Sequence, residues 1–460
     1  MIDEKQLAEL SLPGAPRILT EPPGPQSRAI LEYQAQNEGS AVSYARGLPM
    51  AVARSRGATQ VDADGNIYID MFSGAGVMAL GGAHPEILAA AHAQIDEFTH
   101  TLDIPSQTRE GLVETLKGLL PRELTRIFFG GPTGSDAVEQ ALKLAKWNKK
   151  RNGIIAFEGA YHGMTGASLA VTTDSGHRDG VGELVPGVSF VPYAYSYRNP
   201  FGCPPEETDL YAARWLDRVL RDSHSGVSKP AAVIIEAVQG EGGTIAPPPR
   251  FLQNIRRITQ EHDVLLICDE IQCGLGRTGR MFAFEHSQIV PDIVTLSKAL
   301  GGLGFPISAI AYREELNTLP PGKSIGTFRG NMTAFAAGKA ALEYMVREDI
   351  PGRAALLGEK LLARLKDCEA RSAIVGEVRG IGLMLGIELV KDKTTKEPAP
   401  ALAAKVRTLA HRRGVLVEVG GHFNHVIRLL PPLVITEELA FKAADIIESA
   451  IGEAEKAGCL

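Results

Sequence analysis

Short apolar runs alternate with amphipathic helical segments between about residues 105 and 312. The predicted strands are too uniformly apolar for a sheet with one face in water. They are GIIAF, AAVIIEAV, VLLICDE, IVTLS and ISAIAY. The apolar periodicity of helices appears in SDAVEQALKLAKWNKK, DLYAARWLDRVLRD and RFLQNIRRITQEH. This alternation predicts an α/β fold with a mostly parallel sheet sandwiched by helices.

The two ends of the chain carry a separate α+β pattern. TQVDADGNIYIDM predicts two strands around an Asp64-Gly65 turn. Towards the C-terminus we expect helices at 331–347, at 353–369 and from 436, and strands around 376–389, 414–419 and 426–430. We therefore predict a large domain at residues 66–328 and a smaller α+β domain formed by residues 1–65 and 329–460.

Composition argues against several classes of function. A formal net charge of −6 gives no hint of a nucleic-acid surface. The charged N-terminus lacks the apolar core of a secretory signal, and no apolar run approaches the roughly 20 residues that span a membrane. The cysteines, Cys203, Cys268, Cys273, Cys368 and Cys459, are scattered and odd in number. We expect reduced thiols, a cytoplasmic location and no metal site.

Polar groups follow four of the predicted strands. FEGAYHG follows GIIAF, residues 236–241 follow AAVII, Asp269 and Glu270 follow VLLIC, and Lys298 follows IVTLS. Ligands of open α/β sheets bind at the carboxyl ends of the strands, so these groups are expected to meet there. Taken singly, Lys298 is a solvated lysine and Asp269 one half of a structural salt bridge. Their convergence is what favours a ligand site.

The turn GGPTGSDAVEQ, residues 130–140, runs into a predicted helix. Thr133 and Asp136 have the spacing of a capping box, although aspartate is weaker than glutamate there. Free N–H groups and the positive end of the helix dipole also suit a phosphate. Helix capping alone is the simpler explanation when this turn is considered by itself.

The loop GLGRTG, residues 274–279, has the spelling of a dinucleotide fingerprint. Its glycines begin several residues after the strand rather than in the first turn. Only eleven residues separate Gly279 from Pro291, too few for a crossover helix and the next strand. The context therefore disfavours a nicotinamide or flavin nucleotide at this loop.

Arg428 interrupts the apolar stretch VIRLLPPL, where a buried guanidinium needs a carboxylate from the protein or from a substrate. Glu241 lies in the glycine-lined turn VQGEGG. His422 and His425 in GHFNH lack a third metal ligand, so we interpret them as loop histidines.

These groups together match what pyridoxal 5′-phosphate (PLP) requires. PLP needs a lysine for its imine, a carboxylate for its pyridinium nitrogen, a helix N-terminus for its phosphate and an aromatic face for its ring. The carboxylate keeps the ring protonated, and the protonated ring is the electron sink for a substrate carbanion. The lysine amine then shuttles the proton.

The chain resembles the class III (ω-amino acid) aminotransferases of PLP fold type I over nearly its whole length. The matching stretches are GPTGSDAVEQALKLAK, FEGAYHG, EAVQGEGG, CDEIQCGLGRTG, TLSKALGG, GTFRGN and IRLLPPL. Asp269 and Lys298 stand 29 residues apart, as the family's pair would. Ala237 replaces the proline that usually follows the family's glutamate, which affects a turn and should not abolish activity.

The resemblance implies how the cofactor would be bound. Lys298 would form the imine with PLP, and Asp269 would pair with the pyridinium nitrogen. Tyr161 would stack on the ring, beside His162, and Gln272 would lie near the ring oxygen. The phosphate would be bound by Gly134, Ser135 and, from the partner subunit, Thr327. The resemblance therefore also implies a homodimer with a shared active site.

For the substrates, the resemblance implies that Arg428 clamps the carboxylate of glutamate or 2-oxoglutarate. Glu241 would neutralise Arg428 when the amine substrate has no carboxylate at that end. PYAYSYRNPFG, GTFRGN and VLVEVGGHFNHVIRLLPPL look most like the family's diaminobutyrate aminotransferases. That likeness implies transfer of the 4-amino group of L-2,4-diaminobutyrate to 2-oxoglutarate, giving aspartate 4-semialdehyde and glutamate.

Several alternatives stay open at this point. Class III aminotransferases that use 4-aminobutyrate, ornithine or taurine share the same catalytic set. An amino-acid racemase or epimerase on the same fold would need no amino acceptor. An NAD-dependent oxidoreductase using GLGRTG and a non-catalytic protein of this fold are the remaining possibilities.

Overall fold

A seven-stranded sheet forms the centre of the computed structural model, which describes residues 2–457. Its strand order is β4-β10-β9-β8-β7-β5-β6. Strands β5 to β9 pair in parallel, whereas β10 runs antiparallel to both β4 and β9. The bounds are β4 (Arg126–Phe129), β5 (Ile154–Phe157), β6 (Val188–Val191), β7 (Ala232–Glu236), β8 (Leu265–Asp269), β9 (Ile293–Leu296) and β10 (Ala309–Tyr312). The mostly parallel sheet is confirmed, and β4 and β6 add strands that the sequence analysis did not identify.

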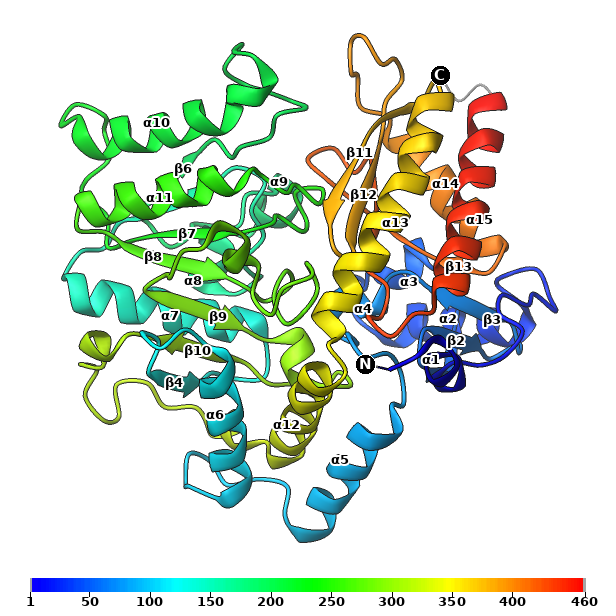
Figure 1. The fold of residues 1–460 in the computed structure, drawn as a ribbon, viewed down its shortest axis with the longest axis horizontal. Coiled ribbons are helices and arrows are strands. Elements are labelled where there is room, and N and C mark those ends of the chain that lie inside the picture. The colour runs from blue at the N-terminus through cyan, green and yellow to red at the C-terminus, as the bar shows by residue number, and fades with distance from the viewer. Residues whose placement is uncertain (1, 458–460) are drawn as a thin grey trace.

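Helices cover both faces of this sheet (Figure 1). Helix α7 (Gly134–Lys149) packs on the face that carries Ile154 and Ile267, whereas α10 (Thr208–Arg221) and α11 (Pro249–Glu261) pack on the opposite face. The rings of Phe157 and Phe251 meet there at 5.9 Å between centroids. Successive side chains of a strand point to opposite faces, which explains why these strands are apolar at nearly every position. The three helices occupy the segments predicted for them.

Two smaller sheets are built from the chain ends. Strands β1 (Val52–Arg56), β2 (Thr59–Asp62) and β3 (Ile67–Asp70) continue into β13 (Val415–Leu416), so the two ends of the chain share one sheet. The other sheet has the order β11-β12-β15-β14. Its strands are β11 (Val375–Ile381), β12 (Met384–Leu389), β14 (Glu418–Gly420) and β15 (Val426–Leu429). A smaller α+β unit from the chain ends is thereby confirmed, and the domain boundaries at residues 65 and 328 stay a prediction.

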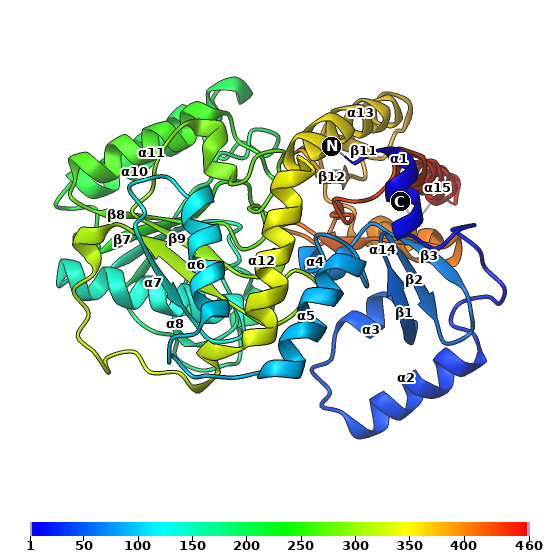
Figure 2. The same cartoon turned by 60° about the horizontal axis from the view of Figure 1, so that its bottom comes forward.

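The remaining long helices connect or cover these sheets. Helix α12 (Met332–Arg347) packs against α5 (Pro85–Glu97) and α6 (Gln107–Leu119) (Figure 2). The C-terminal part adds α13 (Ile350–Arg371), α14 (Pro400–Arg412) and α15 (Glu437–Lys456). The N-terminal part adds α1 (Glu4–Leu10), α2 (Pro25–Asn37), α3 (Tyr44–Gly47) and α4 (Ser73–Gly76). Between residues 2 and 457, no helix has the length and apolar character needed to cross a membrane.

The GLGRTG loop joins the large sheet to the C-terminal part. Arg277 is 2% exposed and donates hydrogen bonds to the backbone carbonyls of Leu383, at 3.0 Å, and Pro431. Gly279 has a φ of +92°, and a Cβ there would lie 2.8 Å from the Cβ of Ala355 on α13. A short 3₁₀ helix, Ala283–Ser287, follows the loop instead of a crossover helix. These contacts give the loop a structural role, in line with the sequence context that disfavours a nucleotide here.

Replacing Arg277 with leucine should lower the free energy of unfolding by about 2–4 kcal/mol. The carbonyls of Leu383 and Pro431 would stay buried without a donor, and each such loss costs about 1–3 kcal/mol. Urea denaturation followed by fluorescence measures the change. The control is Arg280→Leu at an exposed position three residues later, which should change stability by no more than about 0.5 kcal/mol. Unchanged stability of Arg277→Leu would contradict the structural role.

Candidate active site

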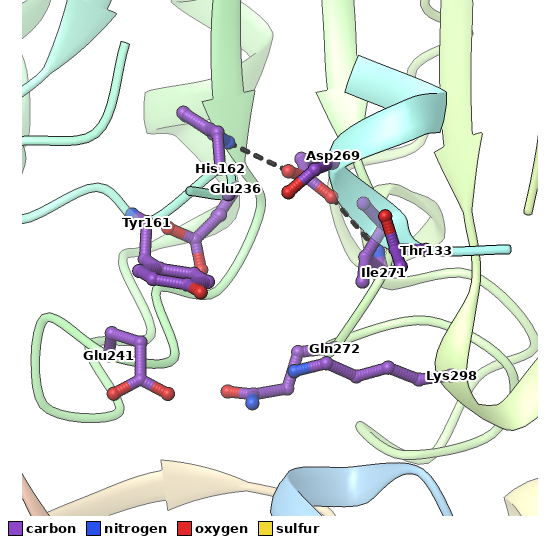
Figure 3. Close-up of a pocket in the computed structure, with 12 residues that line it drawn as sticks. Thr133, Tyr161, His162, Glu236, Glu241, Asp269, Ile271, Gln272 and Lys298 are labelled. Atoms are coloured by element: carbon purple, nitrogen blue, oxygen red, sulfur yellow. Dashed lines mark hydrogen bonds and ion pairs between the residues drawn. The ribbon is translucent and has the colours of Figure 1, made fainter. Parts of the chain in front are cut away.

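A cavity of about 180 Å³ lies at the carboxyl ends of the central strands (Figure 3). It exceeds the roughly 150 Å³ that accommodates one benzene ring. Eight of the ten residues predicted for the site line it: Gly134, Ser135, Tyr161, His162, Glu241, Asp269, Gln272 and Lys298. Thr327 and Arg428 do not line it. The expected convergence of polar groups at strand ends is therefore observed.

Asp269 ends strand β8 and is held by three hydrogen bonds. Its Oδ1 accepts from the backbone N–H of Ile271 at 3.0 Å and from the hydroxyl of Thr295 at 2.9 Å. Its Oδ2 lies 2.7 Å from Nδ1 of His162 (Figure 3). The carboxylate is 3% exposed, and the contacts fix its orientation at the cavity wall. The second ring nitrogen of His162, Nε2, is buried without a hydrogen-bond partner in the described chain.

Lys298 begins the short 3₁₀ helix Lys298–Gly301 directly beyond strand β9. Its φ is +44°, in the left-handed region that costs a non-glycine residue of order 1 kcal/mol. Burial lowers the pKa of its amine, and the negative charge of Glu241 opposes that effect. The side chain extends into the cavity towards Gln272 and Glu241 (Figure 3). A partly buried lysine with a lowered pKa has more of its amine in the nucleophilic, neutral form.

The N-terminus of α7 forms another wall of the cavity. Gly134 and Ser135 occupy its first two positions, whose backbone N–H groups have no partner within a helix. The predicted capping box is present, with Asp136 accepting from the backbone N–H of Thr133 at 2.9 Å and from its hydroxyl at 2.7 Å. The Ser135 hydroxyl accepts from the N–H of Met164 at 3.1 Å. Two free N–H groups at the positive end of a 16-residue helix suit an anion such as phosphate.

Tyr161 and Gln272 both line the cavity, and Gln272 lies between Glu241 and Lys298 (Figure 3). The backbone N–H of Tyr161 donates to Oε1 of Glu236 at 3.1 Å, and burial raises the pKa of the Tyr161 hydroxyl. Gln272 donates to the carbonyl of Ala75 at 3.1 Å, while its Oε1 is buried without a partner in the described chain. An aromatic ring and an unsatisfied amide oxygen thus line the same space.

Arg428 lies just behind the cavity and contacts it through Glu241. Its Nη2 donates to Oε1 of Glu241 at 2.8 Å, as expected from the sequence, and also to Glu418. The Arg428 side chain is 0% exposed, against 13% for Glu418 and 34% for Glu241. Within the described chain, its Nε and Nη1 are buried without partners. Two carboxylates therefore share one guanidinium, and the N–H groups of its Nε and Nη1 are still available as hydrogen-bond donors.

Thr327 lies outside this group of residues. It begins the 3₁₀ helix Thr327–Gly330, its side chain is exposed, and its carbonyl accepts from Nε2 of His100 at 2.7 Å. His422 and His425 lie in the loop between β14 and β15, as expected, and His425 is buried there with Nε2 at 3.1 Å from Oε1 of Glu388. Cys203, Cys268, Cys273 and Cys368 are free thiols, and Cys459 lies outside the described residues.

Sequence reasoning assigned no role to two carboxylates that the structure places here. Glu236 ends strand β7 and accepts from the N–H groups of Tyr161 and Gly240, and burial raises its pKa to about 7. Glu418 lies on β14 opposite Arg428 on β15. A charged residue inside the apolar stretch VLVEVGG is the same kind of signal that identified Arg428.

Comparison with known proteins identifies the family. Residues 41–451 match the family model described as aminotransferase class III. A diaminobutyrate–2-oxoglutarate aminotransferase of Rhizobium meliloti is 43% identical over 418 residues, covering 88% of this chain and 89% of the relative. An alanine/serine racemase of Pyrococcus horikoshii is 34% identical over 450 residues, covering 96% of this chain and 94% of the relative.

A solved structure supports the fold. The amine transaminase from an uncultivated Pseudomonas species, in a form described as PLP-bound, superimposes with a TM-score of 0.82. It is 31% identical in sequence, and the match covers 92% of this chain and 98% of that one. With a family match over most of its length and relatives above 30% identity, this chain belongs to the class III aminotransferases.

Proposed function

We propose that this enzyme uses PLP to move the 4-amino group of L-2,4-diaminobutyrate to 2-oxoglutarate. The products are aspartate 4-semialdehyde and glutamate, and the reaction is reversible. The observation that carries the aminotransferase chemistry is the cavity in which the Lys298 amine, the Asp269 carboxylate and the N-terminus of α7 meet. The choice of donor is supported by the relatives, which include diaminobutyrate–2-oxoglutarate aminotransferases at 37–43% identity.

The residues of the cavity fit PLP in chemistry. Gly134 and Ser135 would receive its phosphate at a helix N-terminus. Tyr161 would cover the ring, and Oε1 of Gln272, which has no partner in the described chain, would be a polar partner for the cofactor. Asp269 would pair with the ring nitrogen, and its contact with His162 holds it in place. When bound, PLP supplies a protonated ring that withdraws electrons from the substrate carbon bearing the amine.

Lys298 and Asp269 would have different roles in the reaction. Lys298 would attach the cofactor through its amine and, once released by the incoming substrate amine, move a proton at the reacting carbon. Its lowered pKa keeps the amine able to accept that proton. Asp269, oriented by its three hydrogen bonds, would hold the ring nitrogen in its protonated form.

Arg428 and Glu241 would allow one site to take both substrates. A carboxylate of glutamate or 2-oxoglutarate would replace Glu241 on Arg428, and Glu241 would return when the amine donor binds. Of its two carboxylate partners, Glu241 is the more exposed and therefore the one that can leave at lower cost. Arg428 would then never be an uncompensated buried charge.

A homodimer would complete the phosphate site. Thr327 is exposed and lies outside the cavity of its own chain, so it would serve the cavity of a second copy. The cytoplasmic location expected from the cysteines stays a prediction.

A racemase is the second candidate, because the alanine/serine racemase relative covers almost the whole chain. Incubating the enzyme with L-2,4-diaminobutyrate, with and without 2-oxoglutarate, separates the two. An aminotransferase forms glutamate and needs the acceptor. Inversion of the donor without an acceptor would support the racemase and contradict our proposal.

Lys298→Ala should abolish turnover, because both the attachment of the cofactor and the proton transfer are lost. Loss of general acid–base catalysis alone costs about 10²- to 10⁴-fold. Glutamate formation and the visible absorbance of the bound cofactor should both decrease, with Lys360→Ala, at an exposed lysine of α13, as the control. Normal turnover in Lys298→Ala would refute the mechanism.

Arg428→Ala should impair the two half-reactions unequally. The single-turnover rate with glutamate should fall about 10- to 100-fold, because charged hydrogen bonds of about 1.5–3 kcal/mol to its carboxylate are lost. The rate with the amine donor should fall far less, since Arg428 then stays with Glu241. Stopped-flow absorbance of each half-reaction measures both rates in one preparation. Equal losses would count against the exchange of partners.

A further inference from the structure

The register of the C-terminal sheet places Glu418 on Arg428. Strand β14 pairs antiparallel with β15, and Glu418 stands directly opposite Arg428. Opposite residues in such a ladder have Cβ atoms about 4.5–5.5 Å apart, so their side chains meet on one face. Glu418 is thus a fixed partner of Arg428, whereas Glu241 reaches the same nitrogen from a turn of the large sheet.

Glu418 also lines a second cavity, of about 470 Å³, with Tyr44, Arg46 and Arg407. Glu241 lines the Lys298 cavity and Glu418 lines this one, and both carboxylates contact the same Nη2 of Arg428. The guanidinium of Arg428 therefore contacts one carboxylate from the wall of each cavity. We call this second space the head-group cavity.

Arg407 is the second charged group of interest in the head-group cavity. It projects from α14 and is partly buried, and it forms no hydrogen bond or ion pair with any residue between 2 and 457. Gly47 makes room for it, since a Cβ at that position would lie 2.7 Å from its Nη1. The charge of Glu418 acts on Arg407 across the cavity, but no carboxylate between residues 2 and 457 accepts a hydrogen bond from it, so its guanidinium suits an anionic group of a ligand.

We propose that Glu418 and Arg407 bind the α-amino acid head group of the amine donor. Glu418 accepts hydrogen bonds from the α-ammonium, and Arg407 binds the α-carboxylate, while the distal amine reaches the Lys298 cavity. This inference rests on the proposed function and narrows its donor to diamino acids with a free head group. Neither residue was assigned a role from the sequence.

Charge balance favours such a donor. Glu241, Arg428, Glu418 and Arg407 contribute two negative and two positive charges, so a zwitterionic head group adds no net charge to the buried set. A monoamino donor such as 4-aminobutyrate brings only the carboxylate and leaves Glu418 without an ammonium. A diamine such as 1,3-diaminopropane brings only the ammonium and leaves Arg407 unpaired. Without the ammonium, Glu418 has only the Arg428 guanidinium, which it shares with Glu241, and without the carboxylate Arg407 has no hydrogen-bonded anion among residues 2–457.

Glu418→Gln tests the contact with the α-ammonium group by comparing L-2,4-diaminobutyrate with 4-aminobutyrate, which has no α-amino group. Single-turnover kcat/KM for L-2,4-diaminobutyrate should fall roughly 10- to 100-fold, the range for a lost charged hydrogen bond. The same constant for 4-aminobutyrate should change no more than about threefold, and Glu418→Asp should recover part of the loss. If Glu418→Gln slows both donors equally, Glu418 only positions Arg428 and the inference is wrong.

Arg407→Gln tests the carboxylate contact in the same way. The rate with L-2,4-diaminobutyrate should again fall roughly 10- to 100-fold, while the rate with 1,3-diaminopropane, which has no carboxylate, should stay within about threefold. Arg412→Gln, an exposed arginine on the same helix, is the matched control and should leave both rates unchanged. Equal losses with both donors would overturn the role of Arg407.

The native enzyme separates failure of this inference from failure of the proposed function. If it forms glutamate from no diamino acid, the proposed donor is wrong and the inference falls with it. If it converts L-2,4-diaminobutyrate, 4-aminobutyrate and 1,3-diaminopropane equally well, the proposed reaction stands and the head-group cavity is refuted. The inference is supported if the native enzyme prefers L-2,4-diaminobutyrate to both other donors. Glu418→Gln should then reduce its preference over 4-aminobutyrate, and Arg407→Gln should reduce its preference over 1,3-diaminopropane.

Discussion

Both faces of the seven-stranded sheet are buried beneath helices, and this constraint decides where the chain can place charge. Strands β5, β7, β8 and β9 have no exposed residue, so an unpaired charge within them would cost several kcal/mol. Glu236 and Asp269 are the last residues of β7 and β8, and Lys298 comes two residues after β9. The groups of the active site meet at one edge because the rest of the sheet cannot accommodate them.

The same burial sets the chemistry of each charged group. Three hydrogen bonds satisfy the oxygens of Asp269, and two carboxylates raise the pKa of Arg428 and keep its guanidinium charged. Lys298 has no such partner among the described residues, and burial lowers its pKa. The environment therefore keeps the guanidinium charged while it favours a neutral amine, and imine chemistry requires such a nucleophilic amine.

The sequence predicted those parts of the molecule that depend on local pattern. Apolar runs revealed β5 and β7 to β10, and strand ends revealed Asp269 and Lys298. The strands RIFF and VSFV, four residues each and only partly buried, gave too little pattern to be recognised, as did helix α14. Glu418 carried a signal that was not used, a charge inside an apolar stretch, but its contact with Arg428 and its closeness to Arg407 could not be predicted. Their proximity depends on how α14 packs and on the β14–β15 register, and neither is visible along the chain.

The arrangement around Arg428 also explains which partner can be exchanged. Glu418 is held by a strand ladder, so moving it would break the sheet. Glu241 lies on a turn whose backbone is held by two hydrogen bonds. The carbonyl of Glu241 accepts from the N–H of Gly421 at 2.8 Å, and the carbonyl of Gly243 accepts from Nε of Arg379 at 2.9 Å. The turn can therefore stay in place while the Glu241 side chain rotates. A substrate carboxylate that takes its position exchanges one negative charge for another, so the buried charge around Arg428 is the same in both half-reactions.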